Sequence, residues 1–138
     1  MASNPSPSTS ASPRSSVAIS FGSPASESGV TRLDLNQILV RHPQAAFLMR
    51  IVGDSMRNAG VDDGDLALVD RALNAAHGQV VIAIVNDEFV CRRLHRHGQD
   101  VRLQSADPAS ADWVPGDGEE LQIWGVVTHV VRPVSLQA

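Results

Sequence analysis

A serine just past the end of a predicted strand, Ser55, is a candidate for a catalytic residue. Residues 47–52 form an apolar run long enough for one strand, and Gly53, Asp54, Ser55 and Met56 follow it. A serine behind a glycine can sit on a tight turn, where its hydroxyl is exposed and backbone N–H groups face a developing oxyanion. The same residues suit a plain turn in which Asp54 and Ser55 bond to their own backbone. The spacing alone favours the plain turn, because short motifs have many false matches.

Length and composition limit the classes of protein that need to be considered. The 138 residues suit one domain, and a formal net charge of -4 with a pI of about 5.6 gives no overall basic field for nucleic acid. All 11 basic residues are arginines. The single cysteine, Cys91, excludes an internal disulfide and fits a reducing compartment. No apolar run is long enough to span a membrane and no secretory signal is evident, so we expect a soluble, cytoplasmic protein.

The chain divides by composition into an arm and a β domain. Residues 1–28 contain 11 serines and four prolines, which predicts a flexible arm, and residues 29–138 form the domain. A short helix capped near Asp34, or an extended entry, is expected within 32–40. Asn86-Asp87 is a hairpin signal, and Gly125 is expected at a bulge or bend. The predicted class is mostly β, with six or seven short strands that include 47–52, 66–69, 79–85, 88–95, 101–104 and 121–131.

Six collinear segments carry a resemblance to a known family. They read RLDLNQ (32–37), GDSM (53–56), DGDL (63–66), AHG (76–78), EF (88–89) and GVVTHVV (125–131). Together they resemble the UmuD-like SOS mutagenesis proteins, within the LexA-like family of self-cleaving Ser–Lys peptidases. The resemblance runs from about residue 21 to 133. It reverses the preference given above and makes Ser55 a candidate nucleophile.

The resemblance implies a fold, a reaction and a set of partners. The fold would have curved, mostly antiparallel sheets in a homodimer, with the N-terminal arm crossing the active site. The serine of a Ser–Lys dyad would cleave a peptide bond in that arm, prompted by a RecA-type recombinase filament. The shortened product would then join a translesion DNA polymerase catalytic subunit. Repressor-type DNA binding is not expected, because the first 28 residues contain one basic residue, Arg14. We expect no cofactor and no metal ion.

Two positions depart from the family pattern. By the match Ser55 takes the nucleophile position, Gly53, Asp54 and Met56 form the turn that would face the oxyanion, and Arg92 replaces the lysine. A buried lysine can lose its proton and act as a base, whereas a guanidinium stays charged in proteins. The cleavage site aligns with Ile19–Ser20, where the family glycine is missing. The pattern suggests a degenerate or inactivated member.

Other side chains receive structural interpretations. His77 and His129 lie where the family also tends to carry histidine, and His42, His95 and His97 are expected in loops or at strand ends. A Ser–His pair nevertheless stays open. Cys91 is interpreted as a small buried residue. The group Asp62, Asp63 and Asp65 resembles fragments of a calcium loop, but its spacing is wrong.

Three hypotheses follow from these residues. The first is a UmuD-like homodimer that engages a polymerase subunit or the recombinase filament and does not process itself. The second is an active self-cleaving peptidase with a histidine, or a water held by Arg92, in place of lysine. The third is a β interaction module unrelated to DNA damage, since a fold does not determine function.

Overall fold

The computed structural model describes residues 32–134. The chain divides between Val40 and Arg41 into two units, which are described separately. In the first, the helix α1 (Leu35–Leu39) begins at Asp34, whose carboxylate accepts a hydrogen bond of 3.1 Å from the Asn36 N–H. Of the two alternatives expected within 32–40, the short helix capped near Asp34 is therefore the one observed. The predicted arm of residues 1–28, its boundary with residue 29 and the Ile19–Ser20 bond lie outside the described residues.

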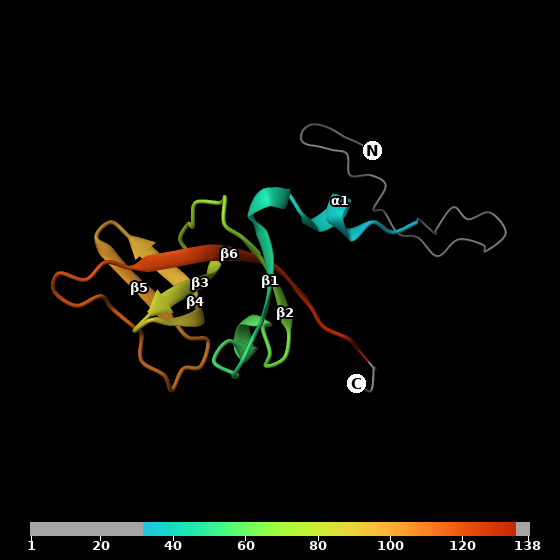
Figure 1. Ribbon diagram of the computed structural model, residues 1–138. Coiled ribbons are helices and arrows are strands. Elements are labelled where there is room, and N and C mark those ends of the chain that lie inside the picture. The colour runs from blue at the N-terminus through green and yellow to red at the C-terminus, as the bar shows by residue number, and fades with distance from the viewer. Residues whose placement is uncertain (1–31, 135–138) are drawn as a thin grey trace, which may run out of the picture. The chain divides into compact units, whose positions relative to one another are not determined.

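The second unit contains one six-stranded antiparallel sheet with the strand order β1-β2-β6-β3-β4-β5 (Figure 1). The prediction of a mostly β fold is confirmed, and the ends of every strand lie within two residues of the expected range. The bounds are β1 Ala46–Arg50, β2 Leu66–Asp70, β3 Val80–Val85, β4 Glu88–His97, β5 Asp100–Gln104 and β6 Gln122–Val131, with short 3-10 helices η2 (Pro43–Ala45) and η3 (Arg57–Ala59).

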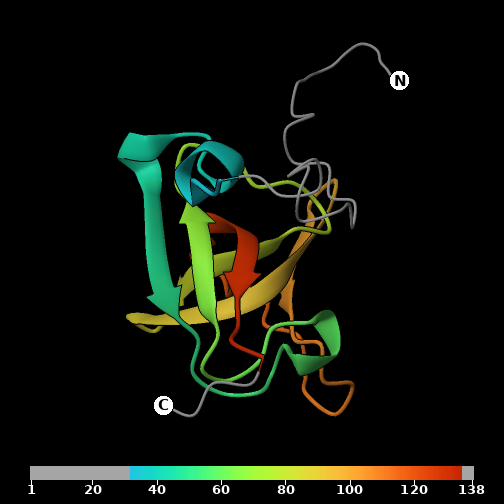
Figure 2. The same cartoon turned by 90° about the vertical axis from the view of Figure 1, so that its right-hand side faces the viewer.

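The strand β6 joins the two halves of the sheet. Its residues 126–131 pair with β2, and its residues 122–126 pair with β3. Figure 2 shows β1, β2 and β6 side by side. The register of β6 against β3 shifts between the partners of Ile82 and Ala83, next to Gly125. The predicted bulge at Gly125 is therefore confirmed. A Cβ at this glycine would lie 2.5 Å from a methyl of Val69, so the strands approach too closely for a side chain.

The hairpin between β3 and β4 turns at Asn86 and Asp87, as the sequence predicts. Both residues have positive φ, 53° and 66°, which is the conformation of a type I′ turn. The register that follows places Ile82 opposite Cys91 and Val81 opposite Arg92. This turn therefore decides which β4 side chain lies at each position of the sheet.

Both faces of β3 are buried, because alternate residues enter two apolar clusters. The first cluster comprises Ile51, Met56, Val61, Ala67, Val69 and Ile82, with Trp124 and Cys91 packed against it. The second comprises Val81, Ala83, Leu94, Leu103 and Val126, with Trp113 packed against it. The apolar run 80–85 thus has the double burial expected of a central strand.

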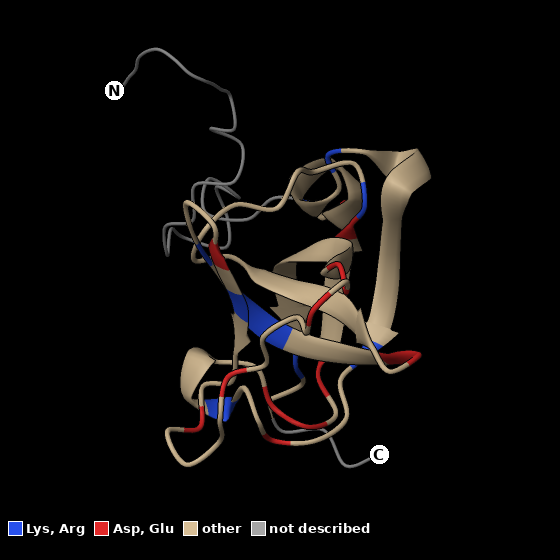
Figure 3. Cartoon of the chain, turned by 90° about the vertical axis from the view of Figure 1, so that its left-hand side faces the viewer, with Lys and Arg blue, Asp and Glu red and all other residues tan. Residues whose placement is uncertain are grey.

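The surface carries charges of both signs. In the view of Figure 3, a short basic stretch lies on a strand and acidic residues occupy the surrounding loops. No helix in residues 32–134 is long enough and apolar enough to cross a membrane.

Candidate active site

Ser55 lies on a turn that hydrogen bonds hold at several points. Gly53 has a φ of +96°, which favours glycine, and its N–H donates to the Asp63 carboxylate over 2.8 Å. The Arg57 N–H closes the turn by donating to the Asp54 carbonyl over 3.1 Å. Met56, the residue after the serine, is 1% exposed and inserts into the first apolar cluster. The turn is thereby anchored on both sides of Ser55.

A distant loop fixes the backbone of Ser55 itself. The Ser55 carbonyl accepts two hydrogen bonds of 2.9 Å, one from the Ser105 hydroxyl and one from the Ala106 N–H. Both donors follow β5, some fifty residues along the chain. Because the carbonyl is held in this way, the backbone position from which the Ser55 side chain projects is fixed.

The aspartates between Ser55 and β2 stabilise this turn. Asp65 is 2% exposed and receives two hydrogen bonds from Arg132, of 2.7 and 2.6 Å. These bonds hold the pKa of Asp65 below its usual value, against the opposing effect of burial. Asp62 bonds to Arg57 over 3.1 Å, and Asp63 caps Gly53. All three carboxylates therefore have hydrogen-bond partners in the protein.

The Arg92 guanidinium reaches the Ser55 hydroxyl. Its Nη1 donates to Ser55 Oγ over 2.9 Å and to the Cys91 carbonyl over 2.7 Å. The resemblance predicts an approach of Ser55 and Arg92 to within about 4 Å, and this distance confirms it. Residues that lie 37 positions apart in the sequence are therefore in direct contact.

The direction of this hydrogen bond determines what the pair can do. A general base accepts the proton of the serine hydroxyl, which requires a free lone pair on the base. A guanidinium has five donors and no acceptor, so Arg92 can only donate to Oγ. It can stabilise negative charge on oxygen, but it cannot remove the proton. In this contact Arg92 is therefore a donor to the hydroxyl and not a base.

A cleft of about 480 Å³ opens around this pair. Its walls come from the end of β1, the Ser55 turn, Ile82 and the first half of β4: residues 49–56, Ile82 and residues 89–92. Val52 and Phe89 on its walls are 87% and 54% exposed. Such apolar walls suit an extended peptide segment. Burial raises the pKa of the Cys91 thiol to about 11, which disfavours the nucleophilic thiolate.

None of the five histidines, all of which lie in residues 32–134, lines the cleft. His42 bonds to Asp70 over 2.6 Å, and His129 lies 3.0 Å from the Thr128 hydroxyl. His77 accepts a hydrogen bond of 3.0 Å from the Arg96 N–H. His95 and His97 lie on β4, beyond the part of the strand that borders the cleft. The sequence left a Ser–His pair open, but none of these histidines lines the cleft that contains Ser55.

Sequence reasoning missed two supports of the site. The sequence predicted no contact of Asp63 or Ser105 with the Ser55 turn. A serine in a loop carries no signal of its distant partner, because the contact depends on how the loop after β5 folds back. Asp63 did carry a signal, because it directly precedes Gly64 in a turn that lies a few residues after the Ser55 turn. An aspartate in a turn commonly accepts hydrogen bonds from nearby backbone N–H groups.

Comparison with known proteins identifies the family. A Peptidase S24-like family model matches residues 13–128. Protein MucA of Salmonella typhimurium is 35% identical over 123 residues, which cover 88% of this chain and 84% of MucA. Protein ImpA of Escherichia coli is 41% identical over 113 residues, which cover 81% of this chain and 76% of ImpA. A LexA repressor of Syntrophotalea carbinolica is 38% identical over 86 residues, which cover 62% of this chain and 43% of the repressor.

Proposed function

Because the chain belongs to the Peptidase S24-like family, as a UmuD-like protein, we propose that it serves SOS mutagenesis as an accessory protein deficient in self-cleavage. In this role it forms a homodimer and engages a translesion DNA polymerase catalytic subunit, a RecA-type recombinase filament, or both. In this role it would work in the cytoplasm.

The observation that carries the proposed deficiency is the contact between Arg92 and Ser55. The nucleophile position has an intact turn, a fixed backbone and a charged donor 2.9 Å from Oγ. Arg92 cannot take the serine proton, because the guanidinium only donates, and none of the histidines within residues 32–134 lines the cleft. The fold and the turn of a peptidase are therefore kept, and the step that requires a base is blocked.

Exposed apolar side chains support the proposed protein contacts. β1 is an edge strand of the sheet, and its Phe47 and Leu48 are 44% and 64% exposed. An apolar edge strand is a common site of association between chains. Val52 and Phe89 give the cleft an apolar lining that fits the apolar residues around Ile19 of the chain's own N-terminal segment.

Self-cleavage with a substitute base is the second candidate function. The hydrogen bond from Arg92 favours self-cleavage, because a guanidinium 2.9 Å from Ser55 Oγ lowers the energy of the serine alkoxide. Hydroxide or a water held by Arg92 would then have to take the proton. This route predicts cleavage that increases steeply with pH and is lost in Ser55→Ala.

A single incubation separates the two candidates. The full chain is incubated with recombinase, ATP and single-stranded DNA at neutral and mildly alkaline pH, and its mass is followed. We expect the chain to stay intact and to bind the recombinase filament or the polymerase subunit in a pull-down. Ser55-dependent loss of 19 residues, by cleavage after Ile19, would overturn the proposed deficiency. Absence of binding to both partners would overturn the accessory role.

A further inference from the structure

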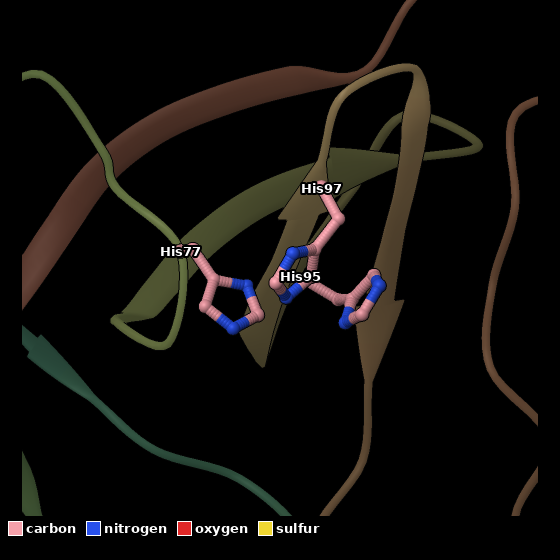
Figure 4. A group of neighbouring side chains, drawn as sticks. All are labelled: His77, His95 and His97. Atoms are coloured by element: carbon pink, nitrogen blue, oxygen red, sulfur yellow. The ribbon is translucent and has the colours of Figure 1, made fainter.

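Three histidines meet at the far end of β4, away from the Ser55 cleft. His95 and His97 lie two residues apart on β4, and His77 lies in the turn before β3. The ring centroids are 5.2 Å apart for His77 and His95, 4.2 Å for His77 and His97, and 4.9 Å for His95 and His97. Figure 4 shows the three side chains grouped at this point. One ring nitrogen from each lies within 4.8 Å of the others.

The backbone brings the three residues together. His95 and His97 share one face of β4, because side chains alternate along a strand. Beyond the paired part of β3, the Leu94 N–H donates to the Gln79 carbonyl and the Gly78 N–H donates to the Leu94 carbonyl, both over 2.8 Å. These bonds hold the turn that carries His77 against the end of β4. The cluster is thus a product of the sheet, although the rings of His77 and His97 are exposed.

We propose that His77, His95 and His97 bind a divalent transition-metal ion of the zinc type, with water completing the coordination. Imidazole nitrogen is the preferred ligand of zinc, copper and nickel ions, and three histidines plus water form a common zinc coordination set. The site is separate from the cleft and does not depend on the proposed function. It was not expected from the sequence, where no metal ion was predicted.

The hydrogen bonds around the cluster determine which nitrogen each ring presents. His95 Nε2 lies 3.3 Å from an Asp100 carboxylate oxygen, so it carries the proton and leaves the Nδ1 lone pair for an ion. A carboxylate behind a metal-binding histidine orients the ring and raises its basicity. His77 Nδ1 already holds a lone pair, which accepts from the Arg96 N–H. The ion would replace this donor, and water can take its place at the exposed Arg96 backbone.

Only a small movement is needed to close the site. Zinc–nitrogen bonds of about 2.0–2.1 Å place ligand nitrogens about 3.3 Å apart in a tetrahedron. Starting from at most 4.8 Å, the rings must approach by about 1.5 Å, which side-chain rotation can supply at exposed positions.

The test measures binding of Zn²⁺ alone, and of Co²⁺ as a coloured substitute, to the metal-free full chain without an affinity tag. We expect one ion per chain with a micromolar dissociation constant, and a Co²⁺ absorption spectrum typical of four ligands. The variant with His77→Gln, His95→Gln and His97→Gln should bind at least about tenfold more weakly. The matched control His129→Gln, at an exposed histidine outside the cluster, should bind like the parent.

Several results would overturn the proposal. They are binding no tighter than millimolar, unchanged binding by the triple variant, equal weakening in His129→Gln, or one ion shared between two chains. If the triple variant does not fold, His97→Gln alone decides the question. This side chain is exposed and has no hydrogen bond to a residue within 32–134, so its replacement should leave the fold intact and still weaken binding.

Discussion

Replacing Arg92 with lysine should place a general base close to the Ser55 hydroxyl. Arg92 Nη1 lies 2.9 Å from Ser55 Oγ, so a side chain at this position already reaches the hydroxyl. A lysine on the same strand presents a single nitrogen that can lose its proton when water is partly excluded. Its nitrogen is one bond closer to the backbone than Nη1. Along the same path it would lie about 4 Å from Oγ, beyond direct hydrogen-bond range.

The geometry determines the expected size of the gain. A well-placed general base contributes about 10²–10⁴ in rate, which corresponds to about 2.7–5.5 kcal/mol of barrier. A misplacement of about 1 Å can remove about 10² of this. Arg92→Lys should therefore raise the cleavage rate by about 10²-fold or less, at the lower end of the range. Adding Ser20→Gly, which restores the family glycine at the predicted cleavage site, should raise it further.

The assay follows the intact mass of the chain over time, with recombinase, ATP and single-stranded DNA, between neutral pH and about pH 10. The product should lack 19 residues, and its rate of formation should rise with pH as the new lysine loses its proton. Arg92→Gln is the matched control, because it removes the guanidinium without supplying a base. It should stay uncleaved, and Ser55→Ala added to Arg92→Lys should abolish cleavage.

The reasoning is refuted if Arg92→Lys with Ser20→Gly stays intact under these conditions while its sheet remains folded. The block would then lie outside the base and the cleavage glycine, and Ser55 would not be a latent nucleophile. Equal cleavage of Arg92→Gln and Arg92→Lys would also refute it, since loss of charge alone would then explain the gain.

Three further predictions concern the supports of the fold. Met56→Ala should lower the free energy of unfolding by about 2–5 kcal/mol in urea titrations, because it leaves a cavity at a side chain that is 1% exposed. The pKa of Asp65 is lowered by Arg132, so the stability from this carboxylate is present above its unfolded pKa of about 3.9 and is lost as the pH falls through the lower folded value. Urea midpoints between pH 6 and 3 should therefore fall less steeply for Asp65→Asn, and an unchanged slope would contradict this. His42→Leu should raise the pKa of Asp70, now held down chiefly by the His42 hydrogen bond, and carbon NMR of the Asp70 carboxyl would detect the rise or its absence.

Several helix, turn and strand features were predictable because their signals are local. The Asp34 cap, the Asn86-Asp87 turn and the β-branched run 80–85 each act within a few residues, and each occurs as expected. The contact between Ser55 and Arg92 was also expected, but from the family resemblance. Composition and spacing alone favoured a plain turn at Ser55.

Contacts that depend on strand register were not predictable. Ser105 reaches the Ser55 carbonyl across fifty residues, and the loop that carries it has no periodic pattern. His77 joins His95 and His97 because backbone bonds extend the β3–β4 pairing beyond Val80. In the sequence these histidines lay in a turn and near a strand end. A shift of one residue in the pairing of β4 would have turned His95 and His97 to the other face.

The position of β6 between β2 and β3 has a consequence for biosynthesis. In the described part of the chain, the Ser55 turn leads into β2, Arg92 lies on β4 beside β3, and β6 is the strand that joins these two hairpins into one sheet. β6 spans 122–131, so it leaves the ribosome after every other strand of the sheet. Until then no strand pairing joins the β1–β2 hairpin to the β3–β4 hairpin. Nothing in the sheet then holds Ser55 close to Arg92. A nascent chain is therefore expected to assemble the cleft only after β6 has been synthesised.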